Sequence, residues 1–426
     1  MIMEFPILMA FITLAVFLIL SVPIGVSIGA SVAVAILLGD LPVEFLMQKL
    51  LMSLDSFPLL AVPFFILAGE IMQKGTMAQA LLNISRCLVG HISGGMAHVS
   101  VLTCMFYGAL SGSAPATVAA VGGIMIPAME RDGYPKTFAT AVNTAGGCLG
   151  VMIPPSVPLI IYGTTANVSV GDLFICGIVP GIFIGVLLMG MSYFLAKRYN
   201  YGTRGECASM GDTFKALNEA KYALLVPLIV LGGIYGGVTT PTEAGAIAVI
   251  YAFAVEGLVL KSLTWAKVVE IFKTSSLTSA SIFIVVATAT ALGQLLMIYN
   301  VPDLLVEALS GLTGNRALLL FVIVVLLLIM GTFMDALANI LILTPLLQPL
   351  LTVAGVDMTH FGIIMIVACS LGFLTPPVGV NLFVGCGIAN ISIERLSYAV
   401  LPFVGIMIVG LLAITYIPAI SLCLLR

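Results

Sequence analysis

The sequence predicts an all-α polytopic membrane protein. Of its 426 residues, 61% are hydrophobic and 8% are charged, and the mean hydropathy is +1.22. Soluble globular proteins carry about 25% charged residues, so the composition excludes that class. Apolar runs of about 20 residues recur along the chain, and each is long enough to cross a hydrocarbon core of about 30 Å. No basic stripe suited to nucleic acid is present.

A repeated pair of helix breaks predicts two related halves. Residues 150–155 read Gly-Val-Met-Ile-Pro-Pro, and residues 372–377 read Gly-Phe-Leu-Thr-Pro-Pro. The same offset of 222 residues aligns further helix breakers, namely Pro127 with Pro349, Gly163 with Gly385 and Pro180 with Pro402. Membrane helices that are broken at equivalent places are typical of transporters, which bind their cargo at the breaks.

The first half, residues 1–199, is expected to begin with spans near 4–21, 23–39 and 55–73. The first run lacks a basic n-region and a small-residue cleavage site, so it is interpreted as a span rather than a signal peptide. Residues 97–129 have a polar centre, Ser111–Pro115, with arms of about 14 residues. At 1.5 Å per residue, each arm reaches about 21 Å and does not cross the core. A re-entrant hairpin is therefore predicted, followed by a broken helix at 136–166 and a span at 172–196.

The second half, residues 219–426, follows the same plan. It is expected to contain spans near 221–237, 243–260 and 276–297, a hairpin at 317–350 centred on 331–336, a broken helix at 359–390 and a last span at 394–424. Residues 200–218 form a basic linker, which the positive-inside rule makes cytoplasmic. Counting from this linker puts both termini outside and brings the two hairpins in from opposite faces, so the halves are predicted to be inverted repeats.

Two cation sites are predicted where each hairpin tip meets its following break. Unwound backbone survives in hydrocarbon only if protein, water or a ligand satisfies it, and the C-terminal ends of half-helices attract cations. Oxygen ligands suit a hard cation such as Na+. The expected Na+ ligands are Ser111, Ser113, Gly147, Gly150 and Ile153 in the first site and Gly331, Asp335, Gly372 and Thr375 in the second. The alternative is that these small residues only allow close helix packing.

Asp335 is the only acidic residue expected near the bilayer centre, where a charge costs about 2.5–3.5 kcal/mol. A bound cation would offset this cost, and protonation is the alternative. Glu70, Glu243 and Glu256 are interpreted as interfacial or helix-pairing residues.

The substrate site is predicted between the two tips, with Asn143, Pro154, Pro155, Ser156, Pro377 and Asn381 as its residues. No Lys or Arg is expected deep in the membrane to bind a carboxylate. An anionic substrate would therefore depend on backbone dipoles, hydroxyl and amide groups, and the charge of Na+.

Several motifs together resemble one family. Residues 63–70 (PFFILAGE), 111–117 (SGSAPAT), 153–156 (IPPS), 235–244 (YGGVTTPTEA) and 375–381 (TPPVGVN) look like the large membrane subunit of tripartite ATP-independent periplasmic (TRAP) transporters. The resemblance covers nearly the whole chain. It implies a Na+-driven elevator transporter in the bacterial inner membrane that takes up organic acids such as sialic acid or C4-dicarboxylates. It also implies a small four-helix membrane subunit and a periplasmic substrate-binding protein as partners.

Alternatives to Na+ symport remain at this stage. Two repeat-related sites favour at least two Na+ per substrate, but a proton-coupled antiporter that uses Asp335 is a second hypothesis. A channel is a third, although hairpins from opposite faces suit alternating access better. An intramembrane enzyme is not expected, because the spans show no paired Asp, no Ser with His and no His-Glu zinc motif. In the elevator hypothesis, residues 97–170 and 317–390 move as one body against the remaining spans.

Overall fold

The computed structural model describes residues 5–20, 22–202, 207–308 and 314–425, and every regular element in these ranges is helical. Within them, eight helices are long and apolar enough to cross a membrane. The bent pair Lys136–Met152 and Val157–Ala166, with 41° between its parts, makes a ninth if it counts as one span. The predicted all-α polytopic fold is confirmed.

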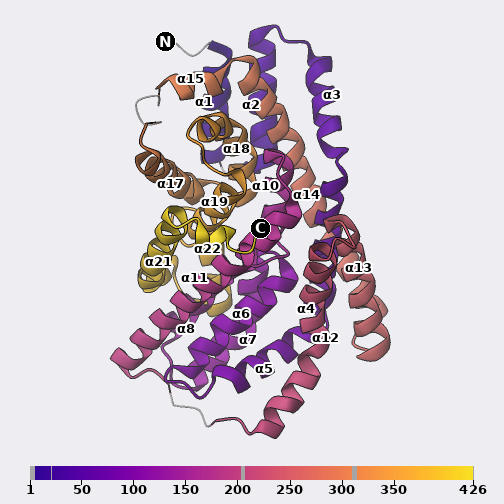
Figure 1. The fold of residues 1–426 in the computed structure, drawn as a ribbon, viewed down its shortest axis with the longest axis vertical. Coiled ribbons are helices and arrows are strands. Elements are labelled where there is room, and N and C mark those ends of the chain that lie inside the picture. The colour runs from indigo at the N-terminus through magenta and orange to yellow at the C-terminus, as the bar shows by residue number, and fades with distance from the viewer. Residues whose placement is uncertain (1–4, 21, 203–206, 309–313, 426) are drawn as a thin grey trace.

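The helices of the first half are drawn from indigo to magenta in Figure 1. They are α1 (Phe5–Ile19), α2 (Ile24–Gly39), α3 (Val43–Leu54), the 3-10 turn η1 (Phe57–Leu60), α4 (Ala61–Lys74), α5 (Met77–Val89), α6 (Gly95–Ser111), α7 (Ala114–Arg131), α8 (Lys136–Gly147), α9 (Leu149–Met152), α10 (Val157–Ala166) and α11 (Val170–Tyr199).

The helices of the second half run from rose to yellow in the same view. They are α12 (Met210–Tyr235), α13 (Pro241–Ala254), the π-turn η2 (Val255–Val259), α14 (Trp265–Ile298), α15 (Val301–Ala308), α17 (Arg316–Phe333), α18 (Ala336–Val353), α19 (Met358–Gly372), α20 (Val380–Ala389), α21 (Ile393–Tyr416) and α22 (Ala419–Leu422).

The helices of the two halves correspond at the offset of 222 residues. The hairpin α6–α7 matches α17–α18, and the bounds of α7 and α18 coincide after the shift. Helices α10 and α20 start one residue apart, as do α11 and α21. Both breaks also contain a cis bond, at Pro154-Pro155 and at Pro376-Pro377. Helix breakers in the sequence therefore mark equivalent places in the structure.

The two halves interlock through the second part of each broken helix. Helix α10 packs against α18 and α19, and α20 packs reciprocally against α7 and α8. Where the halves meet, the Cys148 thiol donates to the carbonyl of Ser370 at 3.1 Å, and these two residues are themselves 222 positions apart. Contact between equivalent residues is the geometry expected near a two-fold relation between repeats.

The long helices α11 and α21 belong with the hairpins. They pack against each other, and between them they contact α6, α8 and α19. We call α6–α11 together with α17–α22 the hairpin body. The remaining spans, α1–α4 and α12–α14, are called the frame.

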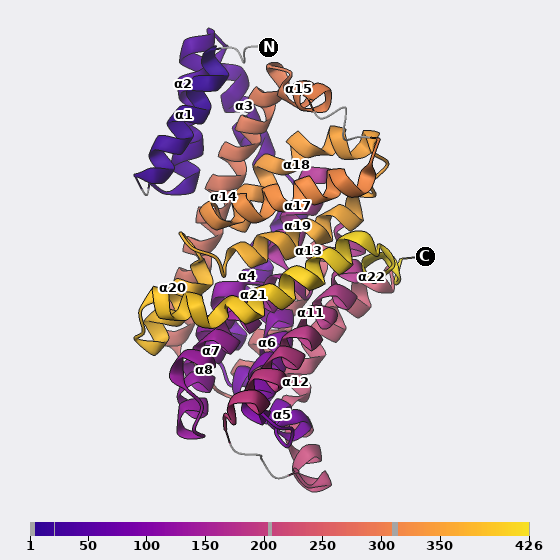
Figure 2. The same ribbon diagram turned by 90° about the vertical axis from the view of Figure 1, so that its left-hand side faces the viewer.

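Helix α14 is the central element of the frame and packs against α2 and α4. A Cβ atom at Gly25 or Gly29 of α2 would lie 2.8 Å from Ile284 or 3.2 Å from Thr288 of α14. Small residues at this spacing let membrane helices approach closely. Figure 2 shows α1 and α2 together at the end of the molecule opposite α5.

Some helix bounds differ from those expected. The hairpin arms have 17 or 18 residues rather than about 14, so each reaches about 27 Å at 1.5 Å per residue. Helix α12 begins at Met210, inside the predicted 200–218 linker, and α14 begins at Trp265. Helices α3 and α5 were not expected, because amphipathic segments do not form long apolar runs.

Candidate functional site

The first hairpin tip brings three oxygens together. Helix α6 ends at Ser111, and Gly112 then takes the left-handed conformation (φ 58°) that turns the chain into α7. The Ser111 hydroxyl lies 3.0 Å from the Thr117 hydroxyl and 3.3 Å from the Ser113 carbonyl oxygen, and Thr117 donates to that carbonyl at 2.8 Å. Two hydroxyls and one carbonyl therefore form a compact triangle.

The first break packs directly against this tip. A Cβ atom at Gly150 would overlap the Thr117 hydroxyl and lie 2.6 Å from the Ser113 carbonyl oxygen. One at Gly112 would lie 2.9 Å from the carbonyl oxygen of Pro155. Only glycine allows these approaches.

The other members of the first predicted cluster lie close by. A Cβ atom at Gly147 would lie 3.3 Å from the Ala114 carbonyl oxygen, and Ile153 is the extended residue that ends α9. The structure therefore brings the first predicted cluster together around the tip.

The second tip and break meet in the same way. A Cβ atom at Gly372 would lie 2.6 Å from the Gly331 Cα, and the Val378 amide donates to the Thr332 carbonyl at 3.2 Å. The Thr375 hydroxyl donates to Leu371 within its own helix, at 3.0 Å. The second predicted cluster is therefore also assembled, with fewer free side-chain oxygens.

Asp335 takes the place in the second tip that Ser113 has in the first. Each is the N-cap residue of the hairpin's second arm: Ser113 accepts from the Ala116 amide at 3.5 Å, and Asp335 accepts from the Leu337 amide at 3.3 Å. Side-chain oxygens at this position satisfy an amide that the helix leaves without a partner.

A cavity of about 270 Å³ lies between the two tips. One wall comes from the first tip, one from the second tip, one from the ends of the breaks, and one from α4 and α14 of the frame. The residues that line it are Ile66, Gly69, Glu70, Gln73, Ser111, Gly112, Ser113, Ala114, Pro115, Ala116, Val151, Val157, Pro158, Thr278, Ile282, Asp335, Ala336, Leu337 and Phe373.

The electrostatics of the cavity come mainly from helix ends and two carboxylates. The first turns of α7, α10 and α18 line it, and each helix N-terminus carries the equivalent of about +0.5 elementary charge. Glu70 and Asp335 are the only ionisable residues among the described lining residues, and none of those is Lys or Arg. An anion in the cavity would meet three positive helix ends and two negative side chains.

The predicted substrate residues lie elsewhere, and none is on the cavity wall. Buried Asn143 donates to the Ser100 hydroxyl at 3.0 Å, and buried Asn381 donates to the Thr144 carbonyl at 3.4 Å. The Ser156 hydroxyl donates to Val151 at 2.6 Å.

The predicted proline positions differ between the two breaks. Pro154 and Pro155 are buried behind the first tip, whereas Pro377 is exposed beside the start of α21. The assignment of these prolines to substrate stays a prediction.

Sequence analysis missed the frame side of the cavity and one tip hydroxyl. Glu70 and Gln73 face the cavity from α4, and Thr117 completes the oxygen triangle. Ile66, Gly69, Glu70 and Gln73 follow the i, i+3, i+4, i+7 spacing of a single helix face, so the presence of two polar residues in that stripe was the available signal.

Two interlocked repeats, each with a hairpin tip packed on a broken helix around a shared cavity, define a polytopic membrane transporter. Over residues 11–420 the chain matches the family described as the DctM component of the tripartite ATP-independent periplasmic transporter. The chain belongs to this family.

Characterised relatives carry related names. The chain is 46% identical over 409 residues to the isethionate TRAP transporter permease protein DctMQ of Oleidesulfovibrio alaskensis, which aligns with 96% of this chain. The chain spans only 64% of that relative's length. It is 35% identical to the C4-dicarboxylate TRAP transporter large permease protein DctM of Rhodobacter capsulatus, with 94% of each chain covered.

The fold also matches a solved transporter. The YdaH transporter of Alcanivorax borkumensis superposes with a TM-score of 0.66 over 88% of each chain at 18% identity, which shows similarity of fold alone. The relatives are permeases rather than enzymes. The family and the apolar helices together identify a multi-pass protein of the bacterial inner membrane.

Proposed function

We propose that this chain is the large permease subunit of a TRAP transporter and carries a small organic acid anion inward, coupled to Na+. The observation that supports this most is the cavity between the hairpin tips, which the first turns of α7, α10 and α18 line. Helix N-termini bind carboxylate, sulfonate and phosphate groups without a basic side chain. Na+ ions would offset the carboxylates of Glu70 and Asp335.

The oxygen triangle of Ser111, Ser113 and Thr117 supports a first Na+ site. Hydroxyl and carbonyl oxygens suit hard cations, and the glycine contacts hold the break against the tip. Repeat symmetry supports a second site at Gly331, Asp335 and Gly372. With two Na+, a monoanion enters with one net positive charge, which a membrane potential of 100 mV favours by about 2.3 kcal/mol.

Alternating access would follow from movement of the hairpin body against the frame. The packing of α11 and α21 on the hairpins extends the moving unit beyond the residues 97–170 and 317–390 inferred from sequence. Helix α5 is the connection from α4 of the frame into the first hairpin, and α15 has the equivalent place before α17.

The cavity favours the small members of the organic acid class. Ligand pockets commonly measure about 300–1,000 Å³, and this cavity of about 270 Å³ lies just below that range. The relatives named for isethionate and C4-dicarboxylates support acids of this size more than a sugar acid such as sialic acid.

The tripartite family name supports two partners, which we propose are a small four-helix membrane subunit and a periplasmic substrate-binding protein. The name DctMQ, on a relative longer than this chain, also supports the membrane subunit.

Uptake into proteoliposomes tests the proposal. The chain is reconstituted with its two partner proteins, and accumulation of radiolabelled isethionate and succinate is followed with and without an inward Na+ gradient. We expect accumulation that requires the Na+ gradient and a Hill coefficient for Na+ above one. Uptake that ignores the Na+ gradient would refute it.

A proton-coupled antiporter is the second candidate, because Asp335 lines the cavity. It predicts flux driven by a pH gradient alone and complete loss of that flux in Asp335→Asn. The same vesicles, with a pH gradient in place of Na+, decide between the two.

A further inference from the structure

One side of the cavity belongs to the frame rather than to the hairpin body. Helix α4 presents Ile66, Gly69, Glu70 and Gln73 to the cavity along one face. At Gly69 a Cβ atom would lie 3.3 Å from the Ser111 Cα, so α4 packs directly on the first tip. Whatever is bound between the tips therefore lies next to the Glu70 carboxylate while the body has this position.

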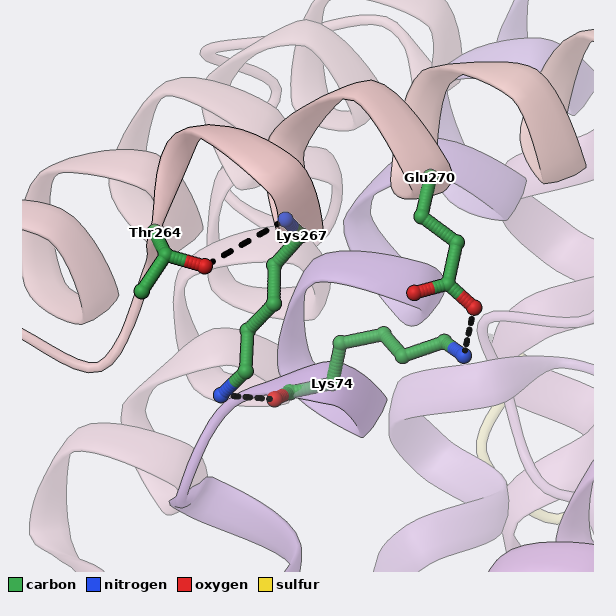
Figure 3. Close-up of polar contacts among 4 residues, drawn as sticks. All are labelled: Lys74, Thr264, Lys267 and Glu270. Carbon is green, nitrogen blue, oxygen red and sulfur yellow. Dashed lines mark hydrogen bonds and ion pairs between the residues drawn. The ribbon is translucent and has the colours of Figure 1, made fainter.

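The Glu70 carboxylate is not neutralised by a neighbour. The nearest cation on its own helix is Lys74, one turn later, and the Lys74 ammonium pairs instead with the Glu270 carboxylate of α14 at 2.8 Å (Figure 3). Within the part of the chain that the structure describes, no hydrogen bond or ion pair engages the Glu70 side chain. Glu70 is half-buried, so water screens it only in part.

An organic anion that enters this cavity alone meets two carboxylates of its own sign. At a separation of about 6 Å and an effective dielectric constant of about 20, each such repulsion weakens binding about a hundredfold. Three helix N-termini offset part of this. Cations at the two tips would offset more, because they would add full positive charges to the same small volume.

We propose that Glu70 makes uptake conditional on Na+, by repelling the substrate anion unless the tip sites hold cations. This role rests on the proposed Na+-coupled uptake. It assigns to a frame residue the suppression of substrate leak without Na+, and it requires Glu70 neither to bind Na+ nor to touch the substrate.

The test compares substrate uptake with and without Na+ in reconstituted complexes that carry charge variants of the α4 face. Glu70→Gln should raise the uptake seen without Na+, and should lower the ratio of the two rates about tenfold or more. Gln73→Glu adds a carboxylate to the same wall and should act oppositely, raising the Na+ concentration needed for half-maximal uptake. Glu130→Gln, at an exposed carboxylate at the far end of α7, is the matched control and should behave as wild type.

The possible results separate the hypotheses. An unchanged ratio in Glu70→Gln, or an equal fall of both rates, would overturn the role. Loss of Na+-dependent uptake alone would also overturn it, by making Glu70 a cation ligand. If Glu70→Gln fails to assemble, Gln73→Glu still decides, since an unaltered Na+ requirement there contradicts the proposal. Wild-type uptake that is indifferent to Na+ would instead refute the proposed function.

Discussion

Glu256 gives a prediction about how the frame holds the first connecting helix. Its carboxylate is fully buried in the π-turn after α13. One oxygen accepts from the backbone amides of Thr76 and Met77 at 2.8 and 3.0 Å, and the other accepts from the hydroxyls of Thr76 and Ser262. Glu256 therefore anchors the N-terminus of α5 to the frame across 180 residues of sequence.

The expected cost of removing the anchor follows from these bonds. Each hydrogen bond to a charged group contributes about 1.5–3 kcal/mol, and two involve backbone amides that α5 cannot satisfy internally. Glu256→Ala should therefore lower the free energy of opening of the first turn of α5 by about 3 kcal/mol. Glu256→Gln keeps one acceptor oxygen and should cost about 1–2 kcal/mol.

Hydrogen exchange of the reconstituted protein measures this directly. Because tenfold corresponds to 1.36 kcal/mol, the Met77 amide should exchange more than a hundredfold faster in Glu256→Ala. Glu270→Gln is the control, because it breaks only the exposed pair with Lys74 shown in Figure 3 and should leave α5 unchanged. An increase below fivefold at Met77, or an equal increase along α6, would refute the anchor.

Three further predictions concern the tips. Gly150→Ala and Gly372→Ala should each abolish uptake, since the added Cβ would overlap a tip, whereas Gly123→Ala has no atom within 4 Å of the new Cβ and should retain it. Thr117→Val removes one oxygen of the triangle and should raise the Na+ concentration for half-maximal uptake about tenfold, a shift that a Na+ titration measures. Gly69→Leu should block transport while leaving binding of the partner proteins intact, as a pull-down would report; normal uptake would show that α4 and the first tip separate freely.

The breaks and tips could be predicted because their signals are local. Proline lacks an amide and fixes φ, so a Pro-Pro pair after glycine marks a broken helix whatever surrounds it. The polar tips at Ser111–Ser113 and Gly331–Asp335 were identified for the same reason, since in hydrocarbon such residues interrupt an otherwise apolar run. The contacts of Gly150 with the first tip and of Gly372 with the second follow from the same breakers.

The lining of the cavity could not be predicted, because it depends on which helix faces meet. Glu70 was interpreted as interfacial, yet the packing of Gly69 on Ser111 turns that face of α4 toward the tips. Asn143 and Asn381 were assigned to substrate, yet both donate to other groups of the protein. A buried amide inside an apolar body usually satisfies the protein first, and sequence alone does not say which partner it finds.

Ser113 and Asp335 show what the repeat preserves and what it leaves free to differ. Both cap the second arm of their hairpin, because a helix that begins inside the membrane must satisfy its first amides. Backbone geometry imposes this requirement equally on both tips, so an oxygen-bearing residue stands at each. The cap does not require a charge, however, and only the second tip carries one. The two predicted cation sites therefore share a backbone plan but differ by one full charge, and ordered binding of the two ions, with the second site filled first, is the consequence expected from electrostatics.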